Sequence, residues 1–143
     1  MKLNVLTRIA SASALTLGLS VSAMANTYSV QSSSNLGDAA AACYIDTTGW
    51  DEARADRCFG STFTINGDST AVFSVIGVNQ SSSQFNVEYL DNTCDSIMNT
   101  TQEGKVCLRA ISPGQKLTQR VRVTDNYTGQ SVVLDAVANY RVF

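Results

Sequence analysis

The segment Ser131-Val132-Val133-Leu134-Asp135-Ala136-Val137-Ala138-Asn139-Tyr140-Arg141-Val142 alternates apolar and polar side chains more clearly than any other part of the sequence. One face carries Val132, Leu134, Ala136, Ala138, Tyr140 and Val142. The opposite face carries Ser131, Asp135, Asn139 and Arg141, with Val133 and Val137 as apolar exceptions. A period of two residues is that of a β-strand with one face against a core. The segment therefore predicts a long strand and an all-β fold.

Six other stretches are also typical of strands, because they alternate in the same way or form short apolar runs. They are 28–32, 59–65, 71–78, 85–89, 106–111 and 117–124. Turn residues separate them, and Asn66-Gly67-Asp68 is a strong hairpin signal between two of them. About seven short strands at close spacing predict a two-layer antiparallel β-sandwich, immunoglobulin-like in architecture. A small barrel is the alternative fold.

Two segments have the pattern of short connecting helices. Asp38–Cys43 contains four consecutive alanines and has room for one or two helical turns. Thr48-Gly49-Trp50-Asp51 resembles a capping box ahead of 52–57. We expect both helices to be short.

Residues 1–25 have the features of a secretory signal peptide. Lys2 and Arg8 form a positive region, a mostly apolar stretch follows over 9–21, and Ala23-Met24-Ala25 supplies a small-x-small cleavage pattern. The apolar stretch is too short for a bilayer span, and no later segment is longer, so we expect no membrane span. The sequence thus predicts a single domain over 26–143. It also predicts a secreted protein, whether extracellular, at the cell surface or periplasmic.

The four cysteines are consistent with export to an oxidising compartment, where they would form two disulfides. Their spacing favours the pairs Cys43–Cys58 and Cys94–Cys107, two local clamps. In the strand over 106–111, Val106, Leu108 and Ala110 make the apolar set, which predicts that Cys107 faces outward with Arg109. Each clamp would close a loop of roughly 15 residues and contribute about 3 kcal/mol in the chain-entropy model.

Composition excludes several classes of function. The chain has 143 residues with 10 Lys and Arg, 12 Asp and Glu, and no His. Without histidine there is no Ser-His-Asp or Cys-His catalysis and no histidine metal site. The formal charge of -2 gives no footprint for nucleic-acid binding. No nucleophile elbow or phosphate-binding glycine loop is present either. We therefore expect a protein that is not an enzyme and that uses no metal or cofactor.

The loop between Cys43 and Cys58 is the densest cluster of acidic and aromatic residues. It contains Trp50, Asp51 and Glu52, and we consider it a candidate recognition loop. The indole ring of Trp50 would stack on a sugar or on a side chain of a partner, and the carboxylates would accept hydrogen bonds. The alternative is that Trp50 packs under the loop as a small satellite core and the acids are solvated.

Charge is unevenly distributed along the mature chain, which has eight basic and twelve acidic residues. Nine of the acids and only two of the bases lie between Asn26 and Asp95, whereas the remainder of the chain is basic. Strand phase sends Arg109, Arg120, Arg122 and Arg141 to polar faces. If their strands are neighbours, they form a basic patch that binds an anionic polysaccharide or another copy of the chain. The alternative is that cross-strand salt bridges join the two halves.

These features favour an exported binding module for an extracellular glycan or protein ligand, with self-association open. A structural subunit of a surface filament or matrix is the second hypothesis. Chaperone–usher pilins are similar in size, compartment and sandwich class, and that resemblance implies a donor strand around Tyr28 and Val30. The third is an inhibitor of a secreted hydrolase, because 107–115 resembles a strand and turn of tendamistat-type amylase inhibitors. The Trp-Arg-Tyr recognition triplet of that family is absent, since Trp50 is followed by Asp51.

Overall fold

The computed structural model describes residues 35–47, 50–101 and 103–143, and for Trp50, Asp51 and Glu52 it describes the backbone only. In this part of the chain the fold is all-β, as predicted, apart from the 3-10 turn η1 (Leu36–Asp38). The strands are β1 (Ala40–Asp46), β2 (Trp50–Glu52), β3 (Arg54–Ala55), β4 (Arg57–Thr62), β5 (Ser69–Ile76), β6 (Phe85–Tyr89), β7 (Ser96–Thr100), β8 (Gly104–Ile111), β9 (Lys116–Asp125) and β10 (Ser131–Val142).

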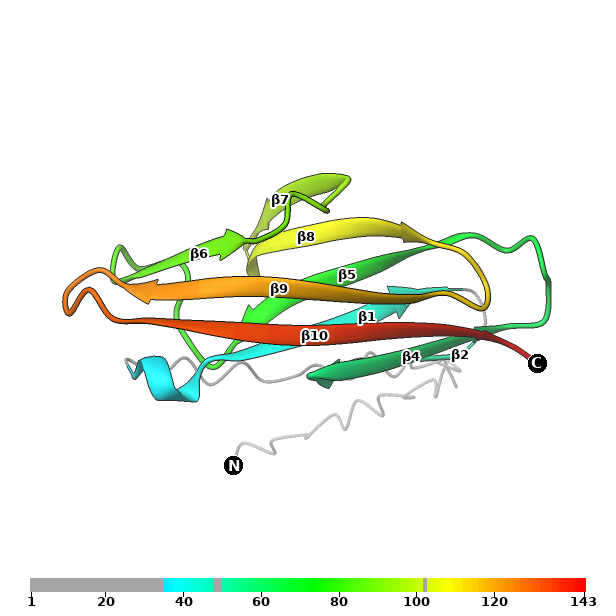
Figure 1. Cartoon of the computed structure of the whole chain (residues 1–143), viewed down its shortest axis with the longest axis horizontal. Coiled ribbons are helices and arrows are strands. Elements are labelled where there is room, and N and C mark those ends of the chain that lie inside the picture. The colour runs from blue at the N-terminus through cyan, green and yellow to red at the C-terminus, as the bar shows by residue number, and fades with distance from the viewer. Residues whose placement is uncertain (1–34, 48–49, 102) are drawn as a thin grey trace, which may run out of the picture.

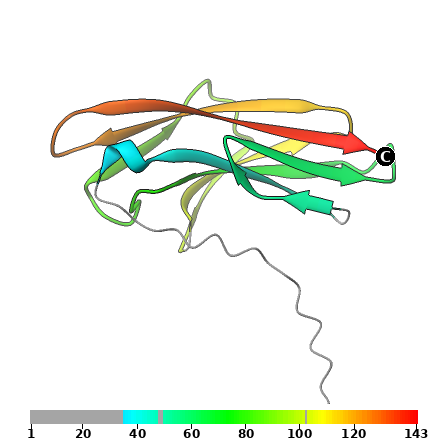
Figure 2. The ribbon, with the colours of Figure 1, turned by 90° about the horizontal axis from the view of Figure 1, so that it is seen from below.

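The strands form two five-stranded sheets, in the orders β3-β1-β5-β8-β7 and β2-β4-β10-β9-β6. Figure 1 shows the strands lying lengthwise, and the turned view in Figure 2 shows β9 and β10 above β1 and β5 as two layers. All pairs are antiparallel except β4 with β10, which is parallel. The long strand β10, which the alternating segment predicts, is paired on both sides.

The core lies between the two layers and is made by the alternating faces of the strands. In β10 the predicted inner face contributes Ala136, Ala138 and Tyr140, each at most 1% exposed. The hydroxyl of Tyr140 donates a hydrogen bond to the Gly67 carbonyl oxygen at 2.8 Å. The loop between β4 and β5 is therefore fixed to the core by a buried side chain.

Both expected disulfides, Cys43–Cys58 and Cys94–Cys107, are formed. Cys43 lies on β1 and Cys58 on β4, so the first disulfide joins the two sheets. The predicted orientation of Cys107 is wrong: its side chain is fully buried, opposite Phe73 in the register. Val106 and Val72 are also buried but lie on the other side of the sheet. Because β5 and β8 carry buried apolar residues on both faces, alternation alone could not identify which face meets the core.

The count of seven strands is also too low, because four of the ten were not expected. The segment 38–43, expected as a helix, is largely β1, whose buried residues Ala41, Cys43 and Ile45 alternate against β5. The segment 52–57 forms parts of β2, β3 and β4 instead of a helix. Tertiary pairing thus overrides the helix propensity of alanine. The turn at 66–68 closes no hairpin, since β4 and β5 belong to different sheets.

The expected signal peptide and the expected strand over 28–32 lie outside the described residues. Among the residues that the structure does describe, no helix is long and apolar enough to cross a membrane.

Candidate binding surface

The outer face of the β2-β4-β10-β9-β6 sheet carries three of the four arginines that the sequence singled out. In β9 the residues Val121 and Val123 face the core and are buried. Arg120 and Arg122 alternate with them, so they lie on the opposite face and are exposed. The register places Arg122 between Glu88 of β6 and Val133 of β10, and it places Arg120 opposite Asp135. Alternation therefore sends both arginines to solvent, as expected, but beside acidic neighbours.

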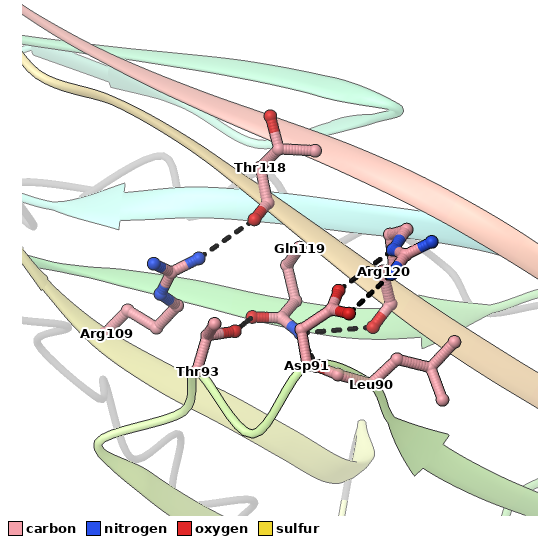
Figure 3. Close-up of polar contacts among 7 residues, drawn as sticks. All are labelled: Leu90, Asp91, Thr93, Arg109, Thr118, Gln119 and Arg120. Carbon is pink, nitrogen blue, oxygen red and sulfur yellow. Dashed lines mark hydrogen bonds and ion pairs between the residues drawn. The ribbon is translucent and has the colours of Figure 1, made fainter.

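Arg120 and Arg122 are both engaged in ion pairs. Arg120 forms a bidentate pair with Asp91, in which Nε lies 2.9 Å from Oδ2 and Nη2 contacts Oδ1 (Figure 3). The hydrogen bonds from Arg120 lower the pKa of the Asp91 carboxyl. Arg122 Nη1 lies 3.0 Å from Glu88 Oε2. These exposed pairs contribute little stability, but they neutralise two of the four arginines expected to form a basic patch.

Arg109 does not join the other arginines, because β8 belongs to the opposite sheet. Its Nη1 donates a hydrogen bond to the Thr118 carbonyl oxygen of β9 at 2.9 Å (Figure 3). The half-buried guanidinium thus spans the gap between the two layers near their edge. This contact is structural, and it directs the charge toward the backbone of the other sheet.

A buried amide that sequence reasoning missed holds the loop bearing Asp91. Gln119 is 2% exposed, and its Nε2 donates to the carbonyl oxygens of Leu90 and Arg120, each at 3.1 Å. Its Oε1 accepts a hydrogen bond from Thr93 Oγ1 at 2.8 Å (Figure 3). Its position between Leu117 and Val121, on the apolar side of the alternation, is the sequence signal that it faces inward. The network fixes the chain between β6 and β7.

Three cations on the same outer face have no ion pair within the described residues: Arg57 of β4, Lys116 of β9 and Arg141 of β10. The register aligns Phe59, Asn139 and Lys116 in one row across the three strands, with Arg57 and Arg141 two positions to either side of it. The guanidinium carbon of Arg141 lies 5.0 Å from the centre of the Phe59 ring. We call these five residues the basic cluster.

Sequence reasoning identified only Arg141 of this cluster. Arg57 was assigned to an expected helix, and Lys116 lies just before the strand that the apolar pattern marked. Both become part of the cluster only through the pairing of β10 with β4 and β9. Parallel pairing between segments this far apart in the sequence leaves no local signal.

The candidate loop residues Trp50, Asp51 and Glu52 form β2, which pairs with β4 next to the cluster. The register places Glu52 opposite Phe59 and Trp50 opposite Ser61. Their side chains are outside the described part of the structure. The recognition loop and the arginine face, considered as separate surfaces in the sequence, are therefore neighbours on one sheet.

A pocket of about 280 Å³ opens between β6, β7 and the start of β8. Three of its polar side chains, those of Gln80, Thr100 and Lys105, bond to the protein backbone. Gln80 bonds to the carbonyl oxygens of Val75 and Glu103 and to the Lys105 amide, and Lys105 Nζ donates to Val87 O at 2.9 Å. The pocket lining contains no carboxylate. The arrangement joins the two layers and brings no acid–base pair together.

No metal-binding cluster of three or more acidic or cysteine side chains occurs among the residues with described positions. No protein-family model, curated protein or solved structure matches the chain.

Proposed function

We propose that the protein is an exported, non-catalytic binding module that recognises an acidic polysaccharide through the basic cluster. The observation that carries this proposal is the row of Phe59, Asn139 and Lys116 flanked by Arg57 and Arg141. Guanidinium groups form bidentate hydrogen bonds with carboxylates and sulfates, and Lys supplies a further point charge. An amide and an aromatic ring between the cations suit the hydroxyls and the apolar face of a sugar.

Immunoglobulin-like topology is part of the proposal. In chain order, β1, β5, β6, β7, β8, β9 and β10 would correspond to strands A to G of that fold. The sheet order β1-β5-β8-β7 then agrees with A-B-E-D, and β6-β9-β10 agrees with C-F-G. In this assignment β4 is added beside strand G, and the inter-sheet disulfide links β1 with β4 instead of strands B and F.

Export is supported by the N-terminal sequence and by the two disulfides. A non-catalytic role is supported by the pocket between β6 and β7, whose lining includes no carboxylate. Two other hypotheses receive less support. A pilin-type subunit needs a groove where a strand is missing, whereas β10 fills the described sheet between β4 and β9. No contact in the described structure favours a hydrolase inhibitor.

The proposal is tested by retention of the mature, oxidised protein on immobilised polygalacturonate and dextran sulfate, with neutral dextran as the reference. We expect retention on the acidic polymers that decreases as salt screens the charges. An Arg57→Gln/Arg141→Gln variant should elute at lower salt. The matched control, Arg120→Gln/Arg122→Gln, removes the same number of arginines from the same face, but from ion pairs.

Equal loss of retention in the two double variants would mean that overall charge, and not the basic cluster, governs binding. Undiminished retention in Arg57→Gln/Arg141→Gln would place the contact elsewhere. Circular dichroism and thermal unfolding confirm that each variant is folded before its retention is interpreted.

A further inference from the structure

The strand β7 is an edge strand without the features that normally prevent edge pairing. It is paired with β8 on one side only in the described structure, so the backbone groups on its other side have no strand partner there. Its sequence, Ser96-Ile97-Met98-Asn99-Thr100, contains no charged residue and no proline. Natural edge strands are usually protected by lysine, proline, a bulge or shortness.

Each face of β7 carries one exposed apolar side chain. Ile97 is 52% exposed and lies opposite Cys107 in the register, on the inner side of the sheet. Met98 is 50% exposed and lies opposite Val106, on the outer side. A strand added beyond β7 would cover part of both side chains as well as pairing with the free backbone groups.

The other three described edges differ from β7. The edge strands β2 and β3 have three and two residues, too few for extended pairing. The edge strand β6 has five residues but carries Glu88, which is in an ion pair with Arg122. In the described part of the chain, β7 is thus the edge best suited to accept another strand.

We infer that β7 is the surface through which two copies of this chain associate, by antiparallel pairing of their β7 strands about a twofold axis at Met98. Placing the middle residue of the strand on the axis lets all five residues pair. Met98 then lies opposite Met98 of the second copy, Ile97 opposite Asn99, and Ser96 opposite Thr100. A twofold contact uses the same surface on both copies, so it ends at a dimer.

A second copy suits this edge because the pairing places no like charges opposite each other. The nearest acid, Asp95, directs Oδ2 to the Ala110 amide of its own β8 at 2.6 Å, away from the open edge. The chain itself contains an uncharged strand that can fill this place, namely β7 of a second copy. The result would be a continuous sheet of ten strands across two copies.

This inference does not depend on the proposed function, because the basic cluster lies on the other sheet. The dimer would leave Arg57, Lys116 and Arg141 of both copies free. A repeating polymer could then engage two clusters at once, which raises apparent affinity without any new contact.

Sedimentation velocity of the mature, oxidised protein from micromolar to millimolar concentration tests the inference. We expect a concentration-dependent monomer–dimer equilibrium that Ile97→Lys abolishes. The matched control is Ile65→Lys, which makes the same chemical change at a residue 79% exposed in the β4–β5 loop, and which should leave the dimer unchanged. The inference would be overturned if the protein were monomeric at all concentrations or formed species larger than a dimer. It would also be overturned if Ile65→Lys, but not Ile97→Lys, abolished the dimer.

The register has its own test, which does not depend on a destabilising charge. Met98→Cys should form a disulfide-linked dimer on a non-reducing gel, because residues opposite each other on antiparallel strands have Cα separations within the range of a disulfide. Ser96→Cys should not cross-link, because Ser96 of one copy lies opposite Thr100 of the other, so the two introduced cysteines are far apart. Cross-linking through Ser96→Cys but not Met98→Cys, or through neither, would contradict the proposed pairing.

Discussion

Replacement of the buried amide of Gln119 provides a direct test of how the loop between β6 and β7 is held. Gln119→Leu keeps a side chain of similar size in the core but removes three hydrogen bonds, those with Leu90 O, Arg120 O and Thr93 Oγ1. The Arg120 carbonyl keeps a second donor, the Leu90 amide at 2.9 Å. The Leu90 carbonyl and the Thr93 hydroxyl lose the partner that Gln119 provides.

Each of these bonds contributes about 1 kcal/mol net to stability, and an unsatisfied buried group costs somewhat more. The apolar side chain of leucine offsets part of this loss. We therefore expect the free energy of unfolding to fall by about 2–3 kcal/mol. For a domain of this size, that change lowers the melting temperature by roughly 10 °C.

The measurement is equilibrium unfolding in urea under oxidising conditions, followed by circular dichroism. Thr93→Val is the matched control, because it removes only the bond to Gln119 Oε1 and should cost about 1 kcal/mol. The double variant should lose less than the sum of the two single losses, since both share that bond. A Gln119→Leu variant as stable as the wild type, or strictly additive losses, would refute the reasoning.

Two further predictions concern other parts of the fold. Gly77 and Gly114 have similar positive φ angles, 83° and 87°, but an added Cβ at Gly77 would lie 1.8 Å from Asp38 O whereas Gly114 has open space. In thermal unfolding, Gly114→Ala should cost about 1 kcal/mol, and Gly77→Ala should cost clearly more; equal costs would contradict the steric argument. Burial raises the pKa of the Glu103 carboxyl above its usual 4.5, so its ionised form opposes folding as pH rises past the unfolded-state pKa. Glu103→Gln should therefore be more stable than the wild type in urea at pH 7, and this difference in stability should disappear below about pH 4.5. If the difference persisted at low pH, ionisation of Glu103 would not be its cause.

The parts of the fold that were predictable from sequence are those with a clear period and one polar face. The strand over 131–142 is the best example, because Ala136, Ala138 and Tyr140 are all buried as the alternation requires. Disulfide spacing also identified both cysteine pairs. In each case the signal lies within a short segment of the chain.

The missed features depend on long-range pairing. The alanine-rich segment of β1 is a strand because it lies between β3 and β5, a fact that local propensity does not contain. The orientation of Cys107 was mispredicted because β8 carries buried residues on both faces, Val106 on one and Cys107 on the other. The edge strand β7 was not expected at all, since its exposed sequence of five uncharged residues has no alternation of polarity.

The candidate site shows the same division between local and long-range information. Arg120 and Arg122 were expected at the surface and are exposed, but their pairing with Asp91 and Glu88 depends on β6 lying beside β9. The basic cluster is assembled from three strands that are distant in sequence. Sequence could therefore indicate which arginines are exposed, but not which of them have an ion pair within the described part of the chain.

The parallel pairing of β4 with β10 also has a consequence for the kinetics of folding. It joins residues that lie far apart in the sequence, such as Arg57 and Val137, and contacts of this kind form slowly because a long loop must close first. The Cys43–Cys58 disulfide closes a much shorter loop and already ties β4 to β1. Oxidation before β10 docks would therefore position β4 in advance and shorten the search for its partner. Refolding should accordingly be faster from the oxidised chain than from the reduced one.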